Sequence, residues 1–229
     1  YKKSRAVFED LLYQNVNQPG GRSSQNSELP NGLMLGAGAK VVATQKNFSQ
    51  GNHITTDNAL DVTIQGAGFF EILMPDGTIS YTRNGQLTTD SEGNLVTSGA
   101  GYQIQPTITV PPDAIEINIS QDGEVSVKLQ GQADNAVLGQ LTVTNFINPA
   151  GLEPIGQNLF KQTGASGDPV QGVPGLEGLG YIVQGALESS NVNVTEELVG
   201  LIESQRVYEM NSKVITAVDQ MLSYAVQNL

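Results

Sequence analysis

The end of the chain carries the pattern that most constrains the fold. After Gly200, neither glycine nor proline occurs as far as Leu229, so nothing interrupts a helix there. Asn193, with Glu196 three residues later, matches a capping box in which Asn replaces Ser or Thr. The pattern predicts a helix over residues 195–227, roughly 50 Å long at about 1.5 Å per residue.

Two apolar stripes follow this predicted helix. One recurs every seven residues, and the other lies beside it. The first contains Leu201, Tyr208, Ile215 and Leu222, extended by Val218 and Ala225; the second contains Val207, Met210, Val214, Ala217, Met221 and Tyr224. A compact globule of this length has a diameter of roughly 45 Å, so a small β domain cannot easily cover both stripes.

Burial of each Leu-sized side chain is worth roughly 1.5–3 kcal/mol, so we expect the stripes to pack against another helix. That helix would come from a segment preceding Tyr1 or from neighbouring copies. The alternative is a helix folded back on its own domain. The residues expected in inter-subunit packing are Leu201, Tyr208, Ile215, Val218, Leu222, Val207, Val214 and Met221.

Residues 55–186 alternate apolar and polar side chains, which is typical of strands with one face on a core. The alternating sets are Leu60, Val62 and Ile64; Ile115, Ile117 and Ile119; Val125, Val127 and Leu129; and Leu141 and Val143. Three turn signals separate the runs: Pro75-Asp76-Gly77, Glu92-Gly93-Asn94 and Gln121-Asp122-Gly123. The predicted fold is mainly β, an antiparallel β domain over residues 55–186 followed by a C-terminal region, residues 187–229, that carries the long α-helix.

Residues 1–54 predict an extended connecting segment. Apolar clusters at Val7 and Phe8 and at residues 11–13 interrupt a polar stretch. Residues 18–27 predict a long loop, because Gly and Pro break both regular periods, and residues 41–48 predict a strand.

Composition excludes several classes of function. The net charge of −12 argues against nucleic acid and anionic membrane surfaces. The absence of Cys excludes disulfides, zinc–thiolate sites and cysteine nucleophiles. No apolar run approaches the ~20 residues of a membrane helix, and no signal peptide is visible. Because the first residue is Tyr1 and not Met, we expect the natural start to lie before it.

No catalytic, cofactor-binding or metal site is predicted. Gly66-Ala67-Gly68 lacks the glycine spacing of a phosphate loop and is interpreted as a turn. His53 is the sole histidine and cannot build a His-rich metal site. The carboxylates that might suggest calcium do not match a calcium-loop spacing; they are Asp57, Asp61, Asp90 and Glu92.

Two long motifs resemble the flagellar rod and hook proteins. The first begins at Gln50-Gly51-Asn52, runs through residues 56–70, and continues with Pro75-Asp76-Gly77, Tyr81-Thr82-Arg83-Asn84-Gly85, Asp90, residues 93–96 and Gly101-Tyr102. The second comprises residues 187–193, 205–211 and 219–222. Within the family, residues 29–38 and 44–48 are similar to the distal rod members. Two departures are Ala67, where an acidic residue is common, and Leu87, where an aromatic is common.

The resemblance implies a self-assembling structural subunit, with no enzymatic activity, of a helical tube that transmits torque to the hook. Terminal helices would form an inner coiled-coil layer, with a family N-terminal helix expected before Tyr1. The implied partners are further copies in a homo-polymer, proximal rod and hook subunits, and the bushing rings of the basal body, in the periplasm after flagellar export. The loop bridging neighbouring subunits would include Pro19, Gly20, Gly21, Leu29 and Pro30.

Two alternatives remain open. One is another rod or hook subunit of the same family. The other is a secreted β-rich glycan-binding module or hydrolase, which needs an aromatic platform or paired carboxylates. The chain has no Trp, aromatic residues make up 6%, and no carboxylate pair stands out.

Overall fold

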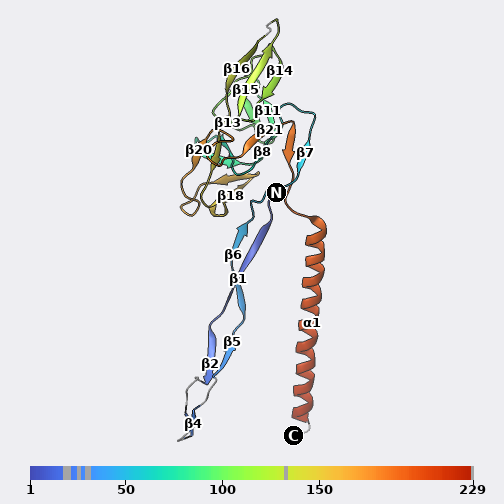
Figure 1. Cartoon of the computed structure of the whole chain (residues 1–229). Helices are drawn as coiled ribbons and strands as arrows, with labels where there is room; N and C mark the ends of the chain where they lie inside the picture. Colours follow the sequence, from blue (N-terminus) through green and yellow to red (C-terminus); the bar gives the residue numbers. More distant parts are fainter. Residues whose placement is uncertain (18–21, 25–26, 29–31, 132–133, 228–229) are drawn as a thin grey trace. The chain divides into compact units, whose positions relative to one another are not determined.

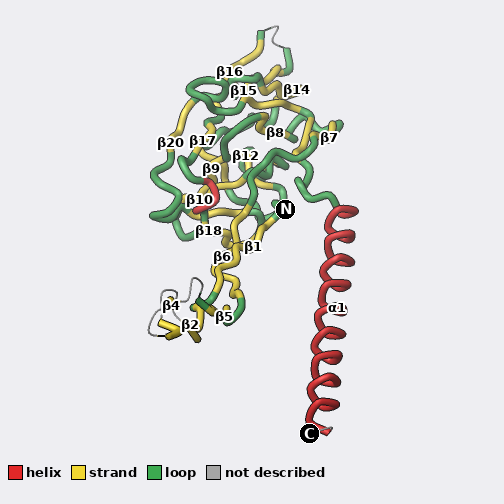
Figure 2. The backbone as a smooth tube through the Cα atoms, turned by 60° about the horizontal axis from the view of Figure 1, so that its bottom comes forward, coloured by secondary structure: helices red, strands yellow, loops and turns green. Residues whose placement is uncertain are grey.

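The computed structural model describes residues 1–17, 22–24, 27–28, 32–131 and 134–227. The chain divides into two compact units, Tyr1–Ser190 and Asn191–Leu229. The first holds all the strands of the described residues and the second holds a long α-helix, coloured red in Figure 2. The prediction of a mainly β chain with a long C-terminal helix is confirmed.

The first unit begins with a long two-stranded arm (Figure 1). Its strands pair antiparallel in succession, and the register shifts by one residue between Val7 and Phe8. The arm pairs are β1 (Ser4–Asp10) with β6 (Ala39–Lys46), β2 (Tyr13–Asn17) with β5 (Leu33–Gly36), and β3 (Arg22–Ser24) with β4 (Ser27–Glu28). The segment predicted to be extended is therefore a paired ribbon, and β3 and the first residue of β4 lie within the predicted loop over residues 18–27.

The β domain is organised around a seven-stranded antiparallel sheet and a three-stranded one. The larger sheet runs in the order β11 (Leu87–Thr89), β12 (Leu95–Thr97), β13 (Gln103–Gln105), β9 (Phe70–Leu73), β10 (Ile79–Thr82), β19 (Leu159–Lys161) and β18 (Glu153–Gly156). The smaller contains β14 (Ala114–Ile119), β15 (Glu124–Leu129) and β16 (Asn135–Gln140).

Three further antiparallel pairs connect distant parts of the chain, and a short 3₁₀ helix, η1 (Pro149–Gly151), follows one of their strands. The pairs are β7 (His53–Thr55) with β22 (Ala186–Glu188), β8 (Val62–Gln65) with β21 (Tyr181–Gln184), and β17 (Val143–Asn145) with β20 (Val170–Gly172). The first two of these pairs bring the beginning and the end of the β domain together.

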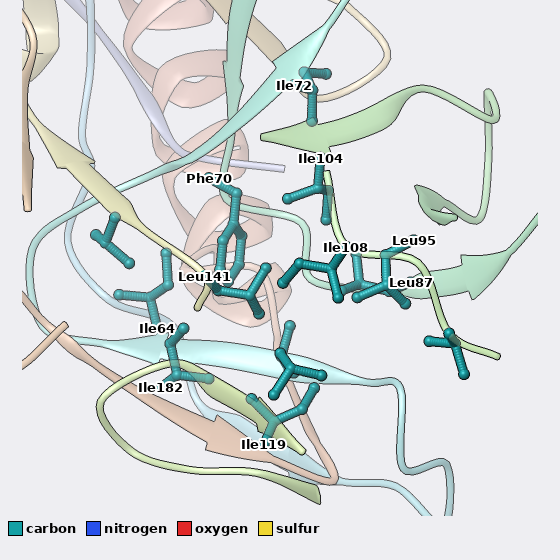
Figure 3. Close-up of a cluster of buried hydrophobic side chains, with 14 of the residues drawn as sticks. Ile64, Phe70, Ile72, Leu87, Leu95, Ile104, Ile108, Ile119, Leu141 and Ile182 are labelled. Carbon is teal, nitrogen blue, oxygen red and sulfur yellow. The ribbon is translucent and has the colours of Figure 1, made fainter. Parts of the chain in front are cut away.

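One apolar core lies between these strands (Figure 3). Ile64 from β8, Phe70 from β9 and Ile182 from β21 are fully buried in it. A second, aromatic cluster contains Phe69 and Phe160, whose rings meet edge to face at 6.0 Å. The domain thus has a complete interior of its own.

The three predicted turns each join two paired strands. Pro75-Asp76-Gly77 connects β9 to β10, the turn at Gly93 connects β11 to β12, and the turn at Gly123 connects β14 to β15. Gly77, Gly93 and Gly123 all have positive φ, which glycine adopts without the steric cost of a side chain.

The burial of the side chains confirms most of the predicted alternation between core-facing and solvent-facing residues and corrects part of it. Val125 and Val127 are buried on one face of β15, as predicted. Ile115, predicted to face the core, is 67% exposed, because a register shift between Ala114 and Glu116 leaves it without a cross-strand partner. In β8 the polar Thr63 is buried as well as its apolar neighbours, so both faces of this strand are covered.

The motif glycine Gly85 lies against the backbone of β8. A Cβ at this position would be 1.7 Å from the carbonyl oxygen of Val62, which leaves no room for a side chain. We expect Gly85→Ala to destabilise the first unit by about 1–3 kcal/mol, as overpacking usually does. Thermal unfolding measures the change. Gly99→Ala is the control, because nothing lies within 4 Å of its Cβ position; equal melting temperatures for the two variants would contradict the assignment.

Candidate assembly surfaces

The second unit is dominated by α1 (Val194–Gln227), a helix of 34 residues. The side-chain oxygen of Asn193 accepts a hydrogen bond from the Thr195 N–H at 3.1 Å, so Asn193 is the N-cap, as predicted. The donor is the second helical residue, whereas the predicted capping box would use the third, Glu196. Glu196 and Glu197 lie in the first turn, where the helix dipole favours negative charge. Among the described residues, no helix combines the length and apolar character needed to cross a membrane.

All eight side chains predicted for inter-subunit packing lie on α1 and are exposed. Their exposed fractions range from 43% for Val218 to 77% for Tyr208. They are Leu201, Val207, Tyr208, Val214, Ile215, Val218, Met221 and Leu222. Exposed apolar area on this scale along one helix is typical of a surface that a partner covers. The five residues predicted for the inter-subunit loop lie outside the described residues: Pro19, Gly20, Gly21, Leu29 and Pro30.

The arm is a second exposed apolar surface, and the sequence did not predict it. Phe8 and Val41 face each other across β1 and β6 and are 67% and 57% exposed, and Leu12 beyond β1 is 92% exposed. A two-stranded ribbon is marginally stable alone in water, and an exposed apolar surface of this kind is typical of one that a partner covers. The sequence signal that could have revealed this surface is two pairs of adjacent apolar residues, Val7 with Phe8 and Val41 with Val42.

At the root of the arm, the carboxylate of Glu188 joins three segments that are distant in the sequence. Its Oε1 accepts hydrogen bonds from the Lys2 ammonium at 2.5 Å and the Gly51 N–H at 2.9 Å, and its Oε2 accepts one from Arg83 Nε at 2.5 Å. The three side chains are buried, with exposed fractions of 5% for Glu188, 8% for Arg83 and 10% for Lys2. We call these three residues the Glu188 cluster.

Arg83 extends the Glu188 cluster into the turn after β8. Its two terminal nitrogens donate to the carbonyl oxygens of Gly68 at 3.1 Å and Gly66 at 2.7 Å. Gly66 and Gly68 both have positive φ and lead into β9, so this segment is a turn before a strand, as predicted, and not a phosphate loop before a helix. The backbone of this turn thus directs the carbonyl oxygens of Gly66 and Gly68 toward the guanidinium of Arg83.

The contacts and burial within the Glu188 cluster shift the pKa values of Glu188 and Lys2. Burial alone would raise the pKa of Glu188, but hydrogen bonds from Lys2, the Gly51 N–H and Arg83 outweigh it and hold the pKa below its ordinary value. Burial lowers the pKa of Lys2, and the hydrogen bond to Glu188 opposes that shift only in part. The carboxylate is therefore the charged anchor of the group.

The residues considered in the sequence for metal binding or catalysis make contacts of an ordinary structural kind. His53 is exposed, and its Nε2 lies 2.8 Å from Gln50 Nε2. The Asp90 carboxylate accepts the Ser91 N–H within the β11–β12 turn. Within the described ranges, no three His, Asp or Glu side chains gather as a metal ion would require.

Comparisons with known proteins agree with the two motifs. The family described as "Flagellar hook protein FlgE/F/G D1 domain" matches residues 63–127, and "Flagellar basal body rod FlgEFG protein C-terminal" matches residues 183–228. The flagellar basal-body rod protein FlgG of Buchnera aphidicola (from Schizaphis graminum) is 52% identical over 97% of this chain and 85% of its own length.

Two further relatives allow the similarity to rod proteins to be compared with the similarity to hook proteins. FlgG of Borreliella burgdorferi is 48% identical over 98% of this chain and 85% of its own length. The flagellar hook protein FlgE of Salmonella typhimurium is 34% identical over 65% of this chain and only 35% of its own length. The similarity to rod proteins is both higher and more complete.

The structure predicts how Glu188 contributes to stability. Glu188→Gln leaves Lys2 and Arg83 buried without a counter-charge, so we expect it to cost about 3–5 kcal/mol at neutral pH. Since the folded-state pKa of Glu188 is lowered, its contribution is present above the ordinary glutamate pKa and is lost as the pH falls through the folded-state value. Denaturant unfolding from about pH 6 to about pH 3 should therefore show a weaker acid dependence in the variant. The control is Glu153→Gln, at an exposed carboxylate; the same loss in both variants would contradict the role of the Glu188 cluster.

Proposed function

The chain belongs to the flagellar rod and hook protein family, and from that premise we propose that it polymerises head to tail into the helical tube of the distal rod. It is a structural subunit of the flagellar rod, in the basal body. The observation that carries the polymer proposal is the exposure of the two apolar stripes on α1. A monomer in water would leave these stripes uncovered, whereas a tube buries them.

In this proposal, α1 packs with equivalent helices as an inner coiled-coil layer and the β domain forms the outer wall. The seven-residue recurrence of Leu201, Tyr208, Ile215 and Leu222 supplies a continuous seam for such packing. The segment from Pro19 to Pro30, part of which the sequence predicts to be a loop, bridges neighbouring subunits. The arm that carries it, exposed and apolar, is suited to the same role.

The subunit would join proximal rod subunits at one end and hook subunits at the other, and turn inside the bushing rings of the basal body. This places it in the periplasm after passage through the flagellar export apparatus. It performs no catalysis in this role and transmits torque mechanically. A glycan-binding module is disfavoured, because the similarity to rod proteins covers nearly the whole chain.

A charge placed in the seam tests the polymer directly. We expect Ile215→Asp to abolish polymerisation and to leave the β domain folded, since a carboxylate is costly to bury between helices. Sedimentation measures assembly, and thermal unfolding reports the β domain. Gln220→Asp is the matched control, because it adds the same charge about 140° around the helix. If the Ile215 variant lost its folded β domain, the helix would instead be folded back on its own domain.

Amide exchange tests whether the seam needs partners. Most helical stability in proteins comes from packing of the apolar face, so we expect residues 201–222 to exchange rapidly in a dilute monomer. The core strand β8 should exchange slowly under the same conditions, because it is buried. Polymerisation should slow exchange in residues 201–222 specifically. Strong protection throughout those residues in the monomer would overturn this expectation.

A further inference from the structure

A groove lies where the arm joins the β domain, and it is lined by residues of β1, the end of β6, and η1. Its volume is about 630 Å³. Phe48, Pro149 and Ala150 supply apolar surface, and Lys3, Arg5 and Lys46 supply positive charge. No carboxylate belongs to its lining, all of which the structure describes. We call this the basal groove.

The apolar part of the basal groove is held in place. The ring of Phe48 meets those of Phe69 and Phe160 edge to face, with centroids 5.4 and 5.1 Å away. Such pairs add about 0.5–1.5 kcal/mol each to the burial of the rings. A binding surface fixed in advance loses little entropy when a partner docks on it.

Arg5 supplies an uncompensated charge to this surface. It is exposed on β1, and across the described residues its guanidinium has no ion pair or hydrogen bond. By contrast, Lys2 and Arg83 nearby are neutralised by Glu188. A free guanidinium beside an apolar surface favours a partner that brings carboxylates.

The far end of the same β domain has the opposite charge. Asp113 directly precedes β14, and its carbonyl oxygen accepts a hydrogen bond from the Gln130 N–H just after β15. Both views place β14, β15 and β16 at the end of the β domain away from β1 and β6 (Figures 1 and 2). These strands and the turns beside them carry five exposed carboxylates, against the single cation Lys128: Asp113, Glu116, Asp122, Glu124 and Asp134. We call this the acidic end.

We propose that the basal groove binds the acidic end of a second copy of this chain. This inference rests on the proposed polymer and specifies one of its contacts. Because the two surfaces lie at different ends of one unit, the contact is heterologous and repeats without closing, as an open helical polymer requires. Complementary charge would also set the direction in which copies join.

The test uses two charge-reversed variants of the full-length protein. One is Arg5→Glu, in the basal groove, and the other is Asp113→Lys with Asp134→Lys, at the acidic end. We expect each alone to raise the critical concentration for polymerisation about ten-fold, since like charges then face each other. An equimolar mixture should polymerise as well as the wild type, because each reversed surface meets a complementary one.

Two controls accompany the variants. Lys161→Glu makes the same charge change at an exposed site outside the basal groove and should leave the critical concentration unchanged. Added salt should weaken wild-type assembly more than that of the Arg5 variant, because screening removes an attraction that the variant lacks. Thermal unfolding checks that each variant is folded.

The outcomes are distinct. Rescue in the mixture, with neither variant assembling normally alone, supports the contact. If the wild type forms tubes and each variant polymerises at the same critical concentration, the contact is wrong and the proposed function stands. The same conclusion follows if the variants are impaired and mixing them restores nothing. A wild type that forms no polymer at any salt concentration overturns both.

Discussion

One buried carboxylate joins three segments of the first unit that are distant in the sequence. Glu188 accepts hydrogen bonds from Lys2, from the Gly51 N–H and from Arg83, and Arg83 in turn holds the turn at Gly66 and Gly68. The residues that precede the arm, the return from the arm and the strand before α1 therefore meet at one point. A buried ion pair is a poor source of net stability but a strict geometric constraint, because breaking it leaves charges unpaired.

The described residues comprise a β domain with an apolar core of its own and two elements, the arm and α1, whose apolar side chains are exposed. The β domain buries Ile64, Phe70 and Ile182 in a closed core. The arm and α1 expose apolar side chains that nothing in the described residues of their own unit covers. A subunit built this way can keep its β domain folded as a monomer and gain interaction energy on assembly, since burial of apolar area drives association.

Local patterns in the sequence predicted the elements that local physics determines. The helix, its Asn193 cap, the glycine turns and the burial of Val125 and Val127 all follow from periodicity and turn chemistry over a few residues. The arm was missed because β1 pairs with β6 across a long intervening segment and β1 does not alternate. The Glu188 cluster was missed because Lys2, Arg83 and Glu188 meet only in the folded chain. Ile115 was misplaced because a bulge shifts the register, and alternation alone cannot reveal a bulge.

The central claim is that this subunit is incomplete alone and becomes complete in a tube. Electron microscopy of the full-length protein, concentrated in neutral buffer, tests it most directly. The account predicts straight tubular polymers with a thin inner layer of helices and an outer wall of β domains. A uniform population of monomers at high concentration, with α1 protected within each molecule, would contradict it.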